Sequence, residues 1–76
     1  MNKTRRKELE RAIELLGEAK DIVDSCRDEE QEYLDNMPEN LQGSERYERA
    51  EEAVNYLDEA YDKIDEVIDN IESASE

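Results

Sequence analysis

Two arrays of regularly spaced apolar residues constrain the fold of this chain more than any other feature. Apolar positions advance by alternating steps of three and four, first from Leu9 to Met37 and then from Tyr47 to Ile71. This spacing gives the a and d positions of a heptad repeat and is typical of helices that pack along a seam. A charged fraction of 45% would also permit disorder, but disordered acidic segments do not keep such phase. The a positions are Leu9, Leu16, Val23, Glu30 and Met37, then Tyr47, Val54, Tyr61 and Ile68; the d positions are Ala12, Ala19, Cys26 and Tyr33, then Ala50, Leu57, Ile64 and Ile71.

The stretch between the arrays has the residues that a helix stop and a helix start require. Pro38 disfavours helical geometry at the residue before it, Gly43 suits a left-handed turn, and Ser44 is a good N-cap. We expect helices over residues 4–36 and 44–74, joined by a connector over 37–43. Two helices of similar length and a short connector predict a single all-α domain, an antiparallel two-helix coiled-coil hairpin.

An antiparallel register follows from pairing a with d positions across the seam. It pairs Leu9 with Ile71 at one end and Tyr33 with Tyr47 at the other, and it places Cys26 against Val54 as a small core residue. Glu30 is the one charged seam residue, and we expect it to reach water or approach Arg27, Arg46 or Arg49. Tyr56, at an outward position, is expected to be exposed.

The two flanks of this seam differ in character. On the e flank the register predicts the ion pairs Lys20–Asp58 and Arg27–Glu51, whereas the g flank is apolar. An uncovered apolar strip of this length is typical of an interface. We therefore expect a homodimer that forms a four-helix bundle. A helix of another protein would use the same strip, and a marginally stable monomer is the third alternative. The expected dimer interface is Leu15, Ile22, Ala53, Ala60, Val67 and Ala74.

The charge balance narrows the choice of partners. With 24 acids, 10 bases and a net charge of −14, the chain is a poor ligand for nucleic acid or an anionic membrane. The basic segment 1–11 is expected to lie beside the acids at the end of the second helix, and these acids argue against a nucleic-acid role for it. Outward carboxylates of the second helix resemble phosphates in their spacing, so they predict binding to a basic host protein; the alternative is a solvated face that maintains solubility. These partner-binding candidates are Glu45, Glu48, Glu52, Glu59, Asp62, Glu66 and Asp69.

The residues that most catalytic or metal sites require are missing from the sequence. There is no histidine, no glycine-rich phosphate loop and no calcium-loop pattern. We expect no enzymatic activity, no cofactor and no metal ion. No apolar run approaches the ~20 residues that span a bilayer, no signal-peptide pattern opens the chain, and one cysteine gives no argument for an oxidising compartment. A cytoplasmic location is expected.

The connector carries a resemblance to known proteins. The run Asp35-Asn36-Met37-Pro38-Glu39-Asn40-Leu41-Gln42-Gly43-Ser44-Glu45-Arg46 resembles the connector of small, uncharacterised acidic helical-hairpin proteins of bacteriophages and Gram-positive bacteria. The resemblance implies a phage or mobile-element origin and supplies no catalytic residues. Asn40, Gln42 and Arg46 are less required by turn geometry, which makes them candidates for a recognition tip, although a purely structural connector explains them as well.

Two functional hypotheses follow from the sequence. The first is a small acidic accessory protein of phage type that binds and modulates or inhibits a host protein, with nucleic-acid mimicry as one mechanism. The second is a structural or assembly module that acts only through homodimerisation.

Overall fold

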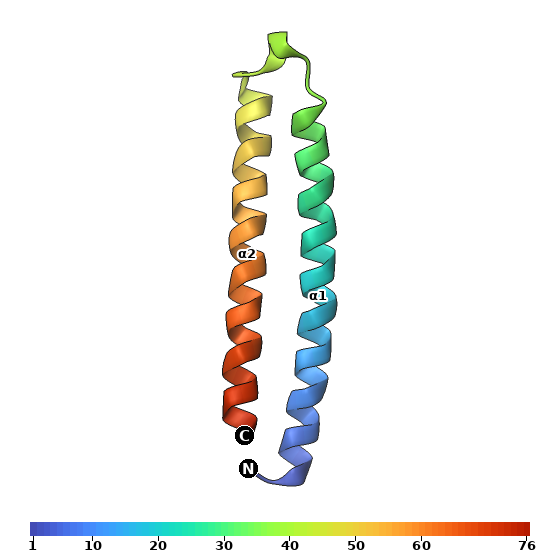
Figure 1. The fold of residues 1–76 in the computed structure, drawn as a ribbon, viewed down its shortest axis with the longest axis vertical. Coiled ribbons are helices and arrows are strands. Elements are labelled where there is room, and N and C mark those ends of the chain that lie inside the picture. The colour runs from blue at the N-terminus through green and yellow to red at the C-terminus, as the bar shows by residue number, and fades with distance from the viewer.

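The protein is an antiparallel hairpin of two long helices. The computed structural model describes residues 1–76, with α1 over Lys3–Asp35 and α2 over Glu45–Ser75. The connector between them holds one 3-10 turn, η1, over Glu39–Leu41. The two helices pack against each other along their length, and the two termini lie at the same end (Figure 1). The predicted all-α helical hairpin is therefore confirmed, and the expected bounds 4–36 and 44–74 each differ by one residue.

Side chains at the helix starts satisfy backbone donors that would otherwise be unpaired. The Asn2 side chain accepts a hydrogen bond from the Arg5 N–H at 2.7 Å, and Ser44 Oγ accepts one from the Tyr47 N–H at 3.3 Å. Such caps stabilise a helix by typically ~1 kcal/mol. Gly43, which precedes the second cap, has a φ of 86°, a conformation that other residues rarely adopt. The connector is thus built by the turn chemistry that the sequence predicted, whereas the cap at Asn2 was missed.

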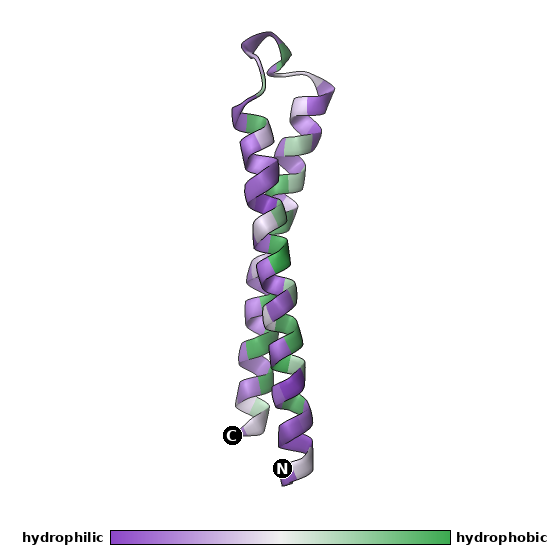
Figure 2. Ribbon diagram, turned by 90° about the vertical axis from the view of Figure 1, so that its right-hand side faces the viewer, coloured by the Kyte–Doolittle hydropathy of each residue, from purple (hydrophilic) through white to green (hydrophobic).

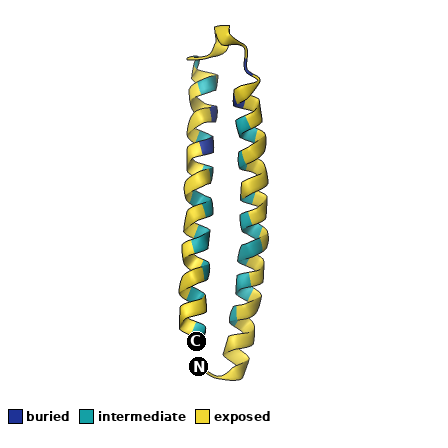
Figure 3. Ribbon diagram, in the orientation of Figure 1, coloured by how far each residue is buried: buried dark blue, intermediate teal, exposed yellow.

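The hairpin is a thin rod with very little core. It extends 59 × 15 × 13 Å and has a radius of gyration of 17.3 Å, against ~11 Å for a compact domain of this length. Only Leu34, Met37, Ala50 and Val54 are buried, and all four lie toward the connector end (Figure 3). Everywhere else the seam residues are at most half-buried, because each helix is covered on one side only.

The seam of α1 lies one position away from the prediction in its connector half. Leu34 is 6% exposed and packs with Ala50 and Val54, while Tyr33 is 44% exposed. Cys26, expected in the core, is exposed, and the neighbouring Arg27 is half-buried. Burying an aliphatic Leu costs no hydroxyl desolvation, and an Arg can lay its apolar stem on the seam with its charge in water. The seam therefore follows a and e positions here, and the predicted a and d seam is wrong.

Two ion pairs join the helices along the e flank. Lys20 Nζ lies 2.5 Å from Asp65 Oδ1, and Arg27 Nε donates to Asp58 Oδ1 at 2.8 Å. Both partners lie one heptad further along α2 than predicted. Helical side chains lean toward their own N-terminus, so in an antiparallel pair Lys20 and Asp65 lean toward each other. The predicted Lys20–Asp58 and Arg27–Glu51 pairs are wrong for this reason, although the flank itself was correctly identified.

These ion pairs change the basicity of the two cations. The hydrogen bond to Asp65 raises the pKa of Lys20 above its ordinary value of 10.5, and partial desolvation opposes it. The ammonium also lies 4.9 Å from the centroid of the Tyr61 ring, a cation–π contact. The hydrogen bond to Asp58 likewise raises the pKa of Arg27. Lys20 is therefore the cross-helix cation whose charge can be removed at high pH.

The small core should depend strongly on Leu34. Replacing Leu34 with Ala is expected to lower the free energy of unfolding by about 2–3 kcal/mol, because it removes buried apolar contacts and leaves a cavity. The matched control is Leu41→Ala in the connector, where the side chain is 39% exposed and the expected change is within about 0.5 kcal/mol. Urea unfolding followed by circular dichroism measures both. Equal losses in the two variants would contradict the position of the core.

Stability at high pH should report on Lys20. A pKa that is raised by folding stabilises the folded state below the unfolded value, and this contribution is lost as pH rises through the folded value. The melting temperature of the wild type should therefore fall relative to that of Lys20→Arg above pH 10.5, because the guanidinium stays charged. A difference in melting temperature that stays constant from pH 7 to pH 11 would contradict the ion pair.

Candidate functional site, an exposed apolar face

Large apolar side chains lie in solvent along one side of the rod. Leu15 is 47% exposed, Ile22 65% and Val67 43%, and all three belong to the strip expected at an interface. Of its alanines, Ala74 is exposed, while Ala53 and Ala60 are half-buried beside the seam. Hydrophobic residues recur along the whole rod between hydrophilic ones (Figure 2). The hairpin alone leaves this strip uncovered.

The shift of the α1 seam widens the strip. In the connector half of α1, where a and e positions face α2, the d positions turn outward, and Cys26 and Tyr33 become exposed. Leu15, Ala19, Ile22 and Cys26 follow each other at the four- and three-residue spacing of a second helical seam, and Tyr33 lies one heptad beyond Cys26. We call the combined surface the apolar face: Leu15, Ala19, Ile22, Cys26 and Tyr33 of α1 with Ala53, Ala60, Val67 and Ala74 of α2.

Sequence reasoning found half of this face and missed the other half. Cys26 and Tyr33 were assigned to the core, because a heptad count with two apolar positions assumes one seam per helix. The available signal was that α1 is apolar at a, d and g positions together, with Ile13 and Leu34 at e. That is more apolar surface than one neighbouring helix covers.

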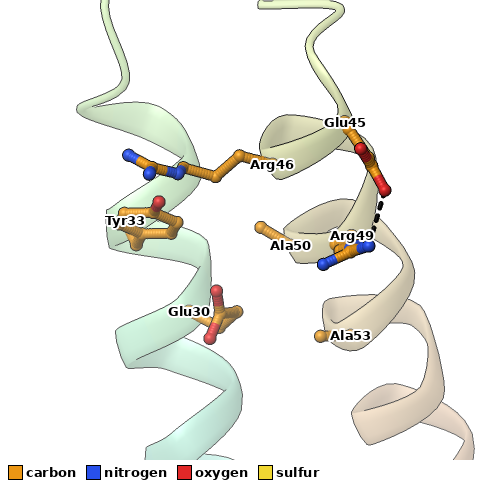
Figure 4. A pocket seen from close by; sticks show the side chains of 7 residues that line it. All are labelled: Glu30, Tyr33, Glu45, Arg46, Arg49, Ala50 and Ala53. Atoms are coloured by element: carbon orange, nitrogen blue, oxygen red, sulfur yellow. Dashed lines mark hydrogen bonds and ion pairs between the residues drawn. The ribbon is translucent and has the colours of Figure 1, made fainter. Parts of the chain in front are cut away.

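A groove at the connector end is lined by residues of both helices, including members of both halves of the apolar face. It has a volume of about 410 Å³. Arg46 reaches from α2 across the groove to lie above Tyr33 of α1, and the buried Ala50 projects from α2 into the space between the helices (Figure 4). Its lining residues are Glu30, Tyr33, Glu45, Arg46, Arg49, Ala50 and Ala53. The ion-paired e flank lies on the other side of the seam, as heptad geometry requires.

Glu30 lines this groove instead of occupying a closed core. It is half-buried and forms no ion pair, although Arg46 and Arg49 line the same groove. Arg49 binds Glu45, one turn earlier in α2, at 2.5 Å. The groove therefore combines an aromatic ring, two guanidinium groups and one free carboxylate, and it is open to solvent.

The predicted partner-binding carboxylates all lie in solvent on α2. Glu45 is engaged with Arg49 at 2.5 Å, so it is not freely available. The other six are exposed and form no ion pair: Glu48, Glu52, Glu59, Asp62, Glu66 and Asp69. They lie on one elongated surface, which can attract a cationic partner.

The basic segment at the start of α1 lies beside the acidic end of α2, as predicted, but no ion pair joins the two. Arg6 lines a shallow depression with Glu72 and Glu76, but no ion pair joins them. The only ion pair of the segment is Arg11–Glu14, within α1, at 3.4 Å. Asp65, which was expected near this segment, binds Lys20. The basic start of α1 and the acidic end of α2 thus attract each other without a direct ion pair.

The connector tip has no built binding site. Asn40 and Gln42 are exposed, and their side chains form no hydrogen bond within the chain. Arg46 lies in a depression of about 330 Å³ that Tyr33, Met37 and Leu41 also line. Met37 is buried beneath the connector, whereas Leu41 stays partly exposed. The tip presents polar groups to solvent, and its folding is explained by turn chemistry.

The arrangement offers association and no evident chemistry. No group of three or more acidic or cysteine side chains is placed to hold a metal ion. Tyr56, at 69% exposed, stands alone among Glu52, Asn55 and Glu59. Neither helix combines the length and the apolar content that a membrane span needs. What the apolar face can do is bury surface against another face.

Comparison with protein family models, with curated proteins and with solved structures finds no match to the chain. The resemblance of the connector to phage and Gram-positive proteins therefore stays a prediction.

Proposed function

We propose that the protein is a self-associating helical module in which two hairpins pair through the apolar face into a four-helix bundle. The observation that carries this proposal is the exposure of Leu15, Ile22 and Val67 on one side of the rod. Contiguous apolar surface of this kind is rare on soluble monomers and is typical of interfaces. A second hairpin supplies the missing layer of a bundle.

The exposed area supports the same conclusion. The hairpin exposes 5884 Å², whereas a compact protein of 8.9 kDa exposes about 4,800 Å². The excess of about 1,000 Å² is close to the ~800 Å² that each partner buries in a standard interface. One additional hairpin is therefore of the right size to bring the surface to normal proportions.

Association also supplies the core that the single hairpin lacks. Four buried residues provide little hydrophobic stabilisation, and chains of this size seldom hold a fold on so small a core. Pairing would bury Ile22, Val67 and Tyr33 together with the half-buried seam residues behind them. Folding and association are then linked, so stability rises with protein concentration.

The outer carboxylates favour a second function for the assembled module. The six exposed carboxylates of α2 that form no ion pair and were predicted to bind a partner lie outside the apolar face. Pairing of two hairpins doubles their number on one particle. A surface with this charge would attract a basic, nucleic-acid-binding host protein and compete with its nucleic acid. In this second proposal the bundle is the scaffold and the acidic rows are the binding surface.

The dimer should depend on Ile22. In sedimentation velocity at tens of micromolar, the wild type is expected to sediment as a dimer, and Ile22→Lys is expected to shift it to the monomer because a charge would be buried. Asn55→Lys, which changes the net charge equally at an exposed position away from the apolar face, should remain dimeric. A wild type that stays monomeric at these concentrations would contradict the proposed function.

Capture of a basic protein should depend on the outward carboxylates of α2 that occupy f positions of the heptad. Replacing Glu52, Glu59 and Glu66 with Lys is expected to lower the affinity for a basic, DNA-binding protein from host lysate about tenfold, because three anionic contacts become repulsive. The control carries the same charge change on α1, as Glu14→Lys, Asp21→Lys and Asp28→Lys. Displacement of the captured protein by duplex DNA measures the competition. Equal capture by both triple variants would remove the mimicry mechanism and leave the self-association proposal standing.

A further inference from the structure

We infer that the two hairpins of the dimer lie with their connectors at the same end, so that α1 of each copy packs against α2 of the other. This inference rests on the proposed self-association and specifies its partner and orientation: a second copy of this chain, related by a twofold axis parallel to the rod. Two independent features of the apolar face support it, the sizes of its side chains and the signs of the charges beside it.

The two halves of the apolar face differ in side-chain size. The α1 half holds Leu15, Ile22 and Tyr33, all at least 44% exposed, whereas the α2 half holds three alanines and Val67. Large side chains fill an interface without voids when they face small ones. The α1 half is therefore complementary to the α2 half of a second copy, and neither half is complementary to itself.

All the bases of α2 lie beside its half of the apolar face. Arg46, Arg49 and Lys63 are the only bases of α2, and all three occupy its c and g positions, next to Ala53, Ala60 and Val67. No acid of α2 occupies a c or g position. Arg46 and Lys63 form no ion pair within the hairpin, and Arg49 binds only Glu45 at the fully exposed surface.

The charges beside the α1 half are mostly negative. Its c and g positions hold Glu8, Glu18, Glu29 and Glu32, none of which forms an ion pair within the hairpin. Arg11 is the one base there, and it is already paired with Glu14 of its own helix. The α1 half thus presents acids where the α2 half presents bases.

In this orientation, acids of one copy and bases of the other lie at similar heights along the rod. Glu30 and Tyr33 line one groove with Arg46 and Arg49, and Lys20 lies on Tyr61; these contacts set which parts of α1 and α2 are level. A rotation about the rod axis keeps every height. It therefore brings Arg49 of the partner subunit to the level of Glu32, and Lys63 of the partner subunit to within about one helical turn of Glu18.

The opposite orientation loses both complementarities. With the connectors at opposite ends, α1 would lie against α1 and α2 against α2. The large side chains would then face large ones. The α2 pair would join two helices whose c and g positions carry only positive charges, with each Lys63 near Lys63 of the partner subunit at the middle of the rod. Like charges in such contact are unfavourable.

A distance between connectors tests the orientation directly. A spin label on Asn40→Cys, in a Cys26→Ser background without other cysteines, should give a distance between subunits of roughly 20–30 Å, since neighbouring helix axes lie ~8–10 Å apart. A distance of about 50 Å, the length of α1 at ~1.5 Å per residue, would overturn the inference but not the dimer. Sedimentation of the labelled protein as a monomer would overturn both.

A charge exchange tests the complementarity separately. Glu18→Lys and Lys63→Glu should each weaken dimerisation about 3- to 10-fold, and the double variant should restore it. Asp21→Lys is the matched control, because it changes the net charge as Glu18→Lys does at an outward position. The control should associate as well as the wild type or better, since it lowers the repulsion of two chains of charge −14. Failure of the double variant to recover, or equal weakening by Asp21→Lys, would overturn the charge pairing.

Discussion

The contact between two long helices governs everything else in this molecule, because one helix shields only one side of another. Leu34, Ala50 and Val54 form the whole closed cluster, and other seam residues stay at most half-buried. The apolar residues beyond the contact have no place inside a hairpin. They remain exposed on its surface, and an exposed apolar strip of this kind is typical of an interface.

The architecture was predictable because it depends on patterns that act locally. Alternating three- and four-residue spacing, Pro38, Gly43 and the Ser44 cap each specify backbone geometry within a few residues. The face of α1 that meets α2 was not predictable in the same way. At two successive heptads, neighbouring residues compete for the place at the seam: Cys26 with Arg27, and Tyr33 with Leu34. The outcome depends on how the apolar stem of Arg27 and the side chain of Leu34 fit α2, which is a property of the packed pair.

The apolar face, too, was predictable only in part. Exposed Leu15, Ile22 and Val67 follow from heptad counting alone, whereas Cys26 and Tyr33 join them only after the seam is known. The ion pairs show a further level of detail: the e flank was evident from charge, but the choice of Asp65 over Asp58 for Lys20 depends on the lean of helical side chains toward their N-termini. Counting positions does not include this lean.

The hairpin brings its first and last residues to one tip of the rod (Figure 1). Any tether, tag or additional domain joined at either terminus would emerge there, about 50 Å from the connector, and both long sides would stay unobstructed. The molecule can thus be attached to a solid support at this tip, which leaves the apolar face free for a second hairpin and the acidic side of α2 free for solvent.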